Sequence, residues 1–382
     1  MYPQEFMIRL VWARPLSVFC IGALVLTIGT SAAGSAAAQP TPATSFGAGR
    51  LDGAFLPVTA IQTNPLPAFG SDADHRTTDA TQIAALIRNN QFDKALALSA
   101  ELIGKSPDRP AGYNLQGIAH LGKGDFTNAR RSFEKALGVS KGNAVAQVNL
   151  AHIDIQQKDL ASARKRFMAV LAKDAGNVDA LLGMAQLDYL KGDAKAALAR
   201  FEKAKAAHPE AIDPWLNIAA YHLRRNNSAQ AVMDLNEAIR IHPDNADLLQ
   251  GLGQAQMAGG RNEAAVSTFR RLTALQPDAP MGYYRLALAQ MASNELPAAS
   301  ESLGRALKLK PDFIEALIAL GGIEIRNKRY AEAIQLAKRV QALTPASANG
   351  LVLEGDALFA QAQYAESARA TTTSGSVSRF AR

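Results

Sequence analysis

Hydrophobic and polar positions recur along this chain with a period of 34 residues. Prolines mark the period most plainly, because their spacings are 34 residues or multiples of 34. These prolines are Pro107, Pro209, Pro243, Pro277, Pro311 and Pro345. An alanine stands twelve residues before each proline, and a large apolar residue follows most of these alanines at the fourth position, as in Phe133, Phe167, Phe201, Leu235, Phe269 and Leu303. Several columns keep one register, so the period predicts a tandem array of a single structural unit.

Each unit opens with a large side chain and has a small one four residues later. The pairs are Tyr113 with Gly117, Leu181 with Ala185, Trp215 with Ala219, Leu249 with Gly253, Tyr283 with Ala287, Leu317 with Gly321 and Leu351 with Gly355. Residues four apart share a helix face, so the small one lets a second helix approach closely. Turn pairs such as Gly192-Asp193 separate this helix from a second one and provide its cap, and the proline stops the second helix. Each unit is therefore predicted to be an antiparallel helix pair.

This pattern resembles that of the tetratricopeptide repeat family over about residues 76–370. Eight units begin at Arg76, Pro110, Ala144, Val178, Ile212, Ala246, Pro280 and Ile314, and a partial ninth begins at Ala348. The first unit is irregular, since Gln82 and Ile83 replace the large and small residues, as in a terminal capping repeat. The resemblance implies an all-α fold, a right-handed superhelical solenoid of helix-turn-helix repeats.

The first 38 residues have the order of a secretory signal peptide. Arg9 and Arg14 precede an apolar run of about 13 residues, and Ala36-Ala37-Ala38 follows as a cleavage site. We expect export with cleavage after Ala38 and a periplasmic or envelope location. A retained membrane anchor and a lipid on Cys20 are the alternatives, although Phe19 makes a poor lipobox.

Two segments flank the repeats. Residues 39–75 are rich in Pro, Ala and Thr and show no periodicity, so they are expected to form a flexible linker. Residues 371–382 contain three consecutive threonines and a Ser-Gly-Ser run, which are poor helix formers and favour a disordered or truncated tail. We therefore expect the apolar face near Leu351 and Leu358 to be partly exposed.

Composition argues against several classes of function. The formal net charge is +7 without a basic run, which disfavours nucleic-acid binding. Cys20 is the one cysteine and lies in the leader, so a mature chain would have no disulfide and no thiolate nucleophile. The six histidines form no metal or nucleophile motif. The sequence therefore indicates a protein that is not an enzyme and needs no cofactor.

One column of polar residues recurs late in the first helix of successive units. Its members are His120, Asp154, Asp188, His222, Gln256, Gln290 and Glu324. Neighbouring helices lie about 8–10 Å apart, too far for adjacent members to share one metal ion. We interpret the column as a solvated or groove-wall stripe, with a polar contact ladder for a partner as the alternative.

The family resemblance implies that the first helices line a concave groove. The fifth residues of the units and residues one turn later would reach into it. These candidate partner contacts are Asn114, Val148, Leu182, Tyr189, Leu216, Gln250, Met257, Tyr284, Met291, Ile318 and Ile325. The set is more apolar than charged, which favours an extended peptide or a helix of a protein partner. About half of these residues are expected to pack between units instead.

A narrower resemblance concerns the wording of several units. Val148-Asn149-Leu150-Ala151 and the run from Gly350 to Asp356 look like those of bacterial repeat lipoproteins of the PEP-CTERM and exopolysaccharide export system. That resemblance implies a scaffold in the cell envelope. Two alternatives remain open, an assembly factor for a pilus or secretion system and a non-catalytic subunit of an envelope enzyme complex.

Overall fold

A computed structural model describes residues 75–362 of the chain, all within one compact unit. The expected signal peptide (1–38), nearly all of the expected linker (39–75) and the expected tail (371–382) lie outside the described residues.

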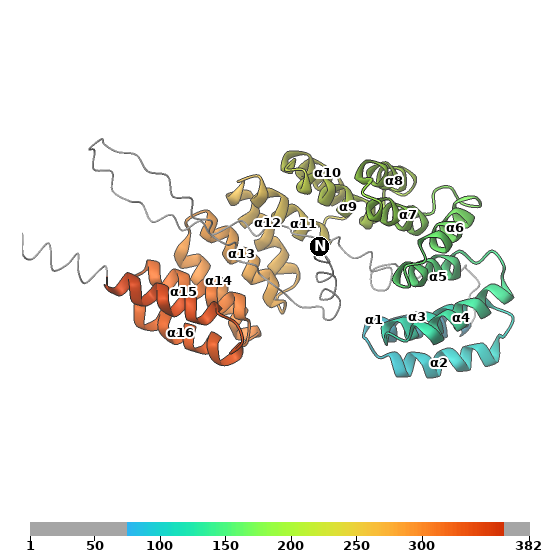
Figure 1. Cartoon of the computed structure of the whole chain (residues 1–382), viewed down its shortest axis with the longest axis horizontal. Coiled ribbons are helices and arrows are strands. Elements are labelled where there is room, and N and C mark those ends of the chain that lie inside the picture. Colours follow the sequence, from blue (N-terminus) through green and yellow to red (C-terminus); the bar gives the residue numbers. More distant parts are fainter. Residues whose placement is uncertain (1–74, 363–382) are drawn as a thin grey trace, which may run out of the picture. The chain divides into compact units, whose positions relative to one another are not determined.

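The described residues form helices in pairs and contain no strand (Figure 1). The first helix of each pair, the A helix, is α1 (His75–Arg88), α3 (Pro110–Gly122), α5 (Ala144–Gln156), α7 (Val178–Leu190), α9 (Ile212–Arg224), α11 (Ala246–Ala258), α13 (Pro280–Ala292) and α15 (Ile314–Arg326). The second, the B helix, is α2 (Phe92–Lys105), α4 (Phe126–Val139), α6 (Leu160–Leu171), α8 (Ala194–Ala207), α10 (Ser228–Ile241), α12 (Asn262–Leu275), α14 (Leu296–Leu309) and α16 (Tyr330–Leu343). Residues 349–362 are helical as well.

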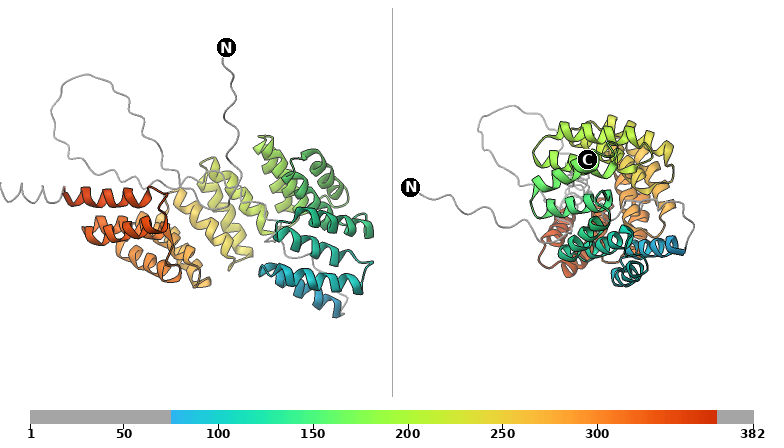
Figure 2. Two further views of the ribbon diagram at one scale, coloured as in Figure 1. Left: turned by 60° about the horizontal axis from the view of Figure 1, so that its bottom comes forward. Right: turned by 90° about the vertical axis from the view of Figure 1, so that its right-hand side faces the viewer.

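Helices that follow one another along the chain contact each other throughout the array (Figure 2). Neighbouring A helices also touch, as α5 does α7 and α9 does α11. The A helices from α3 to α15 begin at the unit starts read from the sequence. The described part of the chain is an all-α repeat superhelix, as predicted.

The turn from A helix to B helix is closed in the same way in each repeat. One residue takes a left-handed φ, for example 82° at Gly192 and 57° at Asn226. The next residue then donates its amide to a carbonyl five positions back, as Asp193 does to Asp188 at 2.9 Å. The Asp193 side chain also accepts from the Ala196 amide at 2.9 Å and so caps α8. Asp125, Asp159 and Asn227 cap their B helices likewise, which confirms the predicted role of the turn pairs.

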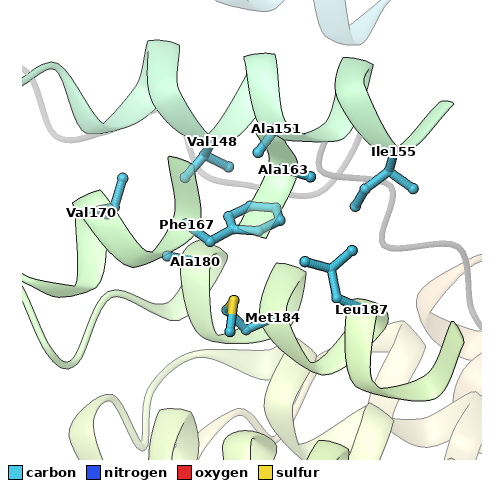
Figure 3. Close-up of a cluster of buried hydrophobic side chains, with 9 residues drawn as sticks. All are labelled: Val148, Ala151, Ile155, Ala163, Phe167, Val170, Ala180, Met184 and Leu187. Atoms are coloured by element: carbon cyan, nitrogen blue, oxygen red, sulfur yellow. The ribbon is translucent and has the colours of Figure 1, made fainter. Parts of the chain in front are cut away.

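The large apolar residue of each B helix forms the centre of the core. Phe167 of α6 is fully buried among residues of α5 and α7, including Val148, Ala151 and Met184 (Figure 3). Its ring therefore joins two successive repeats, because it contacts the A helices of both. This arrangement makes the core continuous along the array, as expected for repeats that bury one face on the next.

The small position of the A helix allows this close packing. A Cβ atom added to Gly117 would lie 2.6 Å from Cε1 of Phe133, and one added to Gly253 would lie 2.5 Å from Cε1 of Phe269. Real Cβ atoms do not approach carbon so closely, so these two positions require glycine. The predicted purpose of the small column is thereby confirmed.

Candidate functional site

The candidate site is the A-helix face, which we define as the eleven predicted contact residues from Asn114 to Ile325. Three of them are buried within the array. Val148 belongs to the core around Phe167, and Leu182 packs against Phe201 of α8. Side chains in these places present little surface to a partner.

Asn114 is also buried, and its role is to join two repeats. Its Nδ2 donates to Oδ1 of Asn143 at 3.0 Å. The same Oδ1 accepts from the amide of Ala146 at 2.8 Å and caps α5. Asn114 therefore holds α3 against the beginning of α5, which is a structural task.

The remaining eight residues of the face are half-buried. They are Tyr189, Leu216, Gln250, Met257, Tyr284, Met291, Ile318 and Ile325. Leu216, Met257 and Met291 each rest on a buried cluster while part of the side chain stays accessible. An apolar side chain fixed from below and open above is suited to contact with another chain.

Tyr284 is the largest anchored side chain in the C-terminal half of the face. Its ring lies 5.1 Å from that of Phe313, which is buried. Burial raises the pKa of Tyr284 to about 12, and the nearby charge of Glu315 acts in the same direction. The phenol therefore stays protonated and can donate a hydrogen bond at any physiological pH.

Charged residues border the apolar positions, and the sequence stage did not single them out. Asp179, Asp213 and Asp247 occupy the second position of α7, α9 and α11. Burial raises the pKa of Asp213, and the like charges of Asp179 and Asp247 raise it further. The signal was present in the sequence, since these residues are 34 apart.

Arg285 of α13 brings the opposite charge. Burial lowers the pKa of its guanidinium, and Nη1 is buried without a hydrogen-bond partner among the described residues. An unpaired buried donor costs free energy in the isolated chain. The A-helix face thus combines half-buried apolar residues with an acidic row and one cation.

The polar column of the A helices does not belong to this face. Asp154, Asp188, Gln256, Gln290 and Glu324 are buried, so the interpretation as a solvated stripe or groove wall is wrong for these five. Asp154 accepts from Arg130 of α4 at 2.6 Å and from Arg166 of α6 at 2.8 Å. The column forms internal bonds because B helices of two repeats enclose it, and we call it the polar ladder.

The partners of the polar ladder change along the array. Asp188 pairs with Arg164 and Arg200, whereas Gln256 accepts from Thr268 and Gln290 accepts from Ser302, both at 2.8 Å. Each acceptor except that of Arg164 lies twelve residues before its donor. Ion pairs in the N-terminal repeats thus give way to neutral hydrogen bonds further along.

The last described helical segment exposes apolar side chains. Leu351, Val352, Leu358 and Phe359 are between 49% and 65% exposed. The sequence predicted this exposure at Leu351 and Leu358.

Two searches of the described residues concern other kinds of site. No three His, Cys, Asp or Glu side chains between residues 75 and 362 are grouped so that they could hold a metal ion. In the same range, no helix has both the length and the apolar character needed to cross a membrane.

Solved structures of other proteins share the fold. A chain of the APC/C hetero-tetramer Cut9-Hcn1 matches with a TM-score of 0.52 at 17% identity, and the match covers 75% of this chain and 57% of that one. Yeast Tom70 matches with a TM-score of 0.53 at 18% identity over 80% of this chain and 68% of its own. The chain thus spans little more than half of the Cut9-Hcn1 chain that it matches, and such identities show the fold alone.

No curated protein sequence is similar enough to this chain to count as a match. Two family models do match, and both describe the tetratricopeptide repeat. One covers residues 81–144 and 284–348, and the other covers residues 120–170, 155–221 and 222–291. These ranges run without a gap through the array of helix pairs, and the chain belongs to the tetratricopeptide repeat family.

Proposed function

We propose that this chain is a non-catalytic scaffold of the bacterial cell envelope that binds an extended peptide or a helix of a partner on its A-helix face. The observation that carries the proposal is the recurrence of half-buried apolar residues, such as Leu216, Met257 and Met291, at equivalent places in successive repeats. A row of anchored apolar side chains fits the regularly spaced side chains of a peptide or helix.

Membership of the repeat family supports the scaffold. Tetratricopeptide repeats as a family bind proteins or peptides, and they present area instead of a reactive group. The partner would be held by apolar contacts along the face, with Tyr284 available as a hydrogen-bond donor. No cofactor enters this proposal.

The envelope location rests on the leader. Arg9, Arg14 and the Ala36-Ala37-Ala38 site support export, and the repeat wording supports a place beside exopolysaccharide export or PEP-CTERM sorting. Mass spectrometry of the protein from its native cells tests the export. A mature chain beginning at Gln39 is expected, and a lipid on Cys20 or an uncleaved leader would contradict soluble export.

Matched methionine substitutions test the binding face. Met257→Glu with Met291→Glu places charges on the A-helix face, whereas Met168→Glu with Met233→Glu places them on exposed B-helix positions. We expect the first pair to abolish partner capture in cells while the second pair leaves it intact. Both variants should keep the helicity of the parent by circular dichroism. Equal capture by both would contradict the proposed face.

A further inference from the structure

A cleft of about 310 Å³ lies outside the A-helix face, between the B helices α12 and α14 and above α13. Its walls are formed by Arg270, Tyr283, Leu286, Gln290, Ala298, Glu301, Ser302 and Arg305. Tyr283 and Gln290 adjoin Tyr284 and Met291 in the chain, but successive helical residues point about 100° apart. The cleft and the A-helix face therefore use different sides of α13.

The polar ladder explains why the cleft is open in this repeat. In earlier repeats the residue twelve positions after the ladder carboxylate is an arginine, Arg166 or Arg200, whose long side chain reaches the carboxylate. The corresponding residue here is Ser302, which donates to Gln290 at 2.8 Å. A serine occupies much less volume than an arginine, so the space above the ladder is left unfilled.

The walls of the cleft combine an apolar floor with a cationic rim. Leu286 and Ala298 are apolar, and the Tyr283 ring lies beside them with the guanidinium of Arg305 at 5.9 Å from its centroid. Arg270 stands on the other rim, from α12. Against these two cations the cleft has one carboxylate, Glu301, so its net charge is positive.

We propose that this cleft binds an aromatic carboxylate. The ring of such a ligand would stack on Tyr283 and contact Leu286 and Ala298, where it buries apolar area. Its carboxylate would accept charge-assisted hydrogen bonds from Arg270 or Arg305, which guanidinium groups form well with planar carboxylates. The site is independent of the proposed function, because none of its residues belongs to the A-helix face.

Ligand-observed NMR on the full chain tests the proposal with three probes. Benzoate represents a small free acid, N-acetylphenylalanine represents the C-terminus of a partner chain, and N-acetylphenylalanine amide is the neutral counterpart. A ligand of this size held by an open cleft should bind with a Kd of about 1 mM. We expect at least one acid to bind and the amide to bind about tenfold more weakly or not at all.

A variant designed from the chain itself fills the cleft. Gln290→Asp with Ser302→Arg copies the Asp188–Arg200 pair of an earlier repeat, so the fold should tolerate it. The matched control, Gln256→Asp with Thr268→Arg, makes the same change one repeat earlier and leaves the cleft open. The first variant should lose acid binding and the control should keep it, with parental circular dichroism for both.

Charge variants complete the test. Arg270→Gln with Arg305→Gln should abolish binding of the acids, and Glu301→Gln should strengthen it because the rim loses its one negative charge. Equal binding of acid and amide, retained binding in the filled variant, or no binding of any acid to the parent would each overturn the proposal. Preference for N-acetylphenylalanine over benzoate would identify a chain terminus as the source, and the reverse preference would identify a small acid.

Discussion

Asp188 of α7 and Arg200 of α8 form a buried ion pair that joins the two helices of one repeat. They stand twelve residues apart, and the same spacing joins Gln256 to Thr268 by a hydrogen bond of 2.8 Å. The two pairs are alternative solutions to one packing problem, because both satisfy a polar group that the neighbouring B helices enclose. The chain therefore contains its own neutral replacement for each buried ion pair.

This equivalence predicts the stability of ladder variants. Arg200→Ala should destabilise the repeat by about 2–3 kcal/mol, because it leaves the Asp188 carboxylate buried with Arg164 as its remaining partner. Asp188→Gln with Arg200→Thr, which copies the Gln256–Thr268 pair, should recover most of that loss. Urea denaturation followed by circular dichroism measures both. If the double variant is less stable than the single one, the two pairs are not equivalent.

Two glycines offer a matched pair of substitutions. Gly253→Ala should destabilise the array by about 1–3 kcal/mol, since the new Cβ would lie 2.5 Å from the buried ring of Phe269. Gly304→Ala in α14 should stabilise it by about 0.5–1 kcal/mol, because nothing lies within 4 Å of the added atom and alanine favours a helix. Thermal unfolding of the two variants should move in opposite directions. A common direction would show that the close approach at Gly253 does not govern the packing.

His152 predicts a pH dependence. Its ring packs edge-on against Phe167 at 5.4 Å, and burial lowers its pKa to about 4. The unfolded chain takes up this proton at a higher pH than the folded chain. Stability is therefore full above about pH 6.5 and falls as the pH drops toward 4, by at most about 1.4 kcal/mol per pH unit.

The control for this prediction is His152→Leu, which has no proton to gain. The difference between its unfolding midpoint and that of the parent should change between pH 7 and pH 5, in favour of the variant at pH 5. A constant difference would show that the imidazole is accessible to protons in the folded chain.

Asp213 predicts a gain in stability. Burial and the charges of Asp179 and Asp247 raise its pKa, so the ionised carboxylate is unfavourable in the folded chain at pH 7. Asp213→Asn removes that charge and should raise the unfolding midpoint at pH 7. The gain should shrink as the pH falls through the pKa range of a carboxyl group, where the parent is neutral as well. A lower midpoint at pH 7 would contradict the assignment.

The period of 34 residues predicted the fold because each column has a packing task that a single sequence displays. Phe167 had to be large and Gly253 had to be small, and the structure shows both reasons. The polar ladder was misread because polarity alone does not tell which face another helix covers. The signal that would have corrected it is the paired change from Asp with Arg to Gln with Thr or Ser, twelve residues apart.

The burial of the A-helix face was equally hidden. Leu182 and Leu216 hold the same position in successive units, yet Leu182 is buried and Leu216 is half-buried. Neighbouring side chains decide the difference, and they come from other helices. A Cβ on Gly251 of α11, for example, would lie 3.4 Å from Cδ2 of Leu216 of α9. Such contacts follow from the superhelix and not from one unit.

Site-specific photo-cross-linking in cells tests most directly that the A-helix face binds the partner. A photoreactive residue is placed at Met257 or Met291 on the A-helix face and, as the control, at Met233, which is 64% exposed on the B helix α10. We predict that the first two positions cross-link to the same protein partner and that position 233 does not. Adducts with that partner at Met233, with none at Met257 and Met291, would contradict the account.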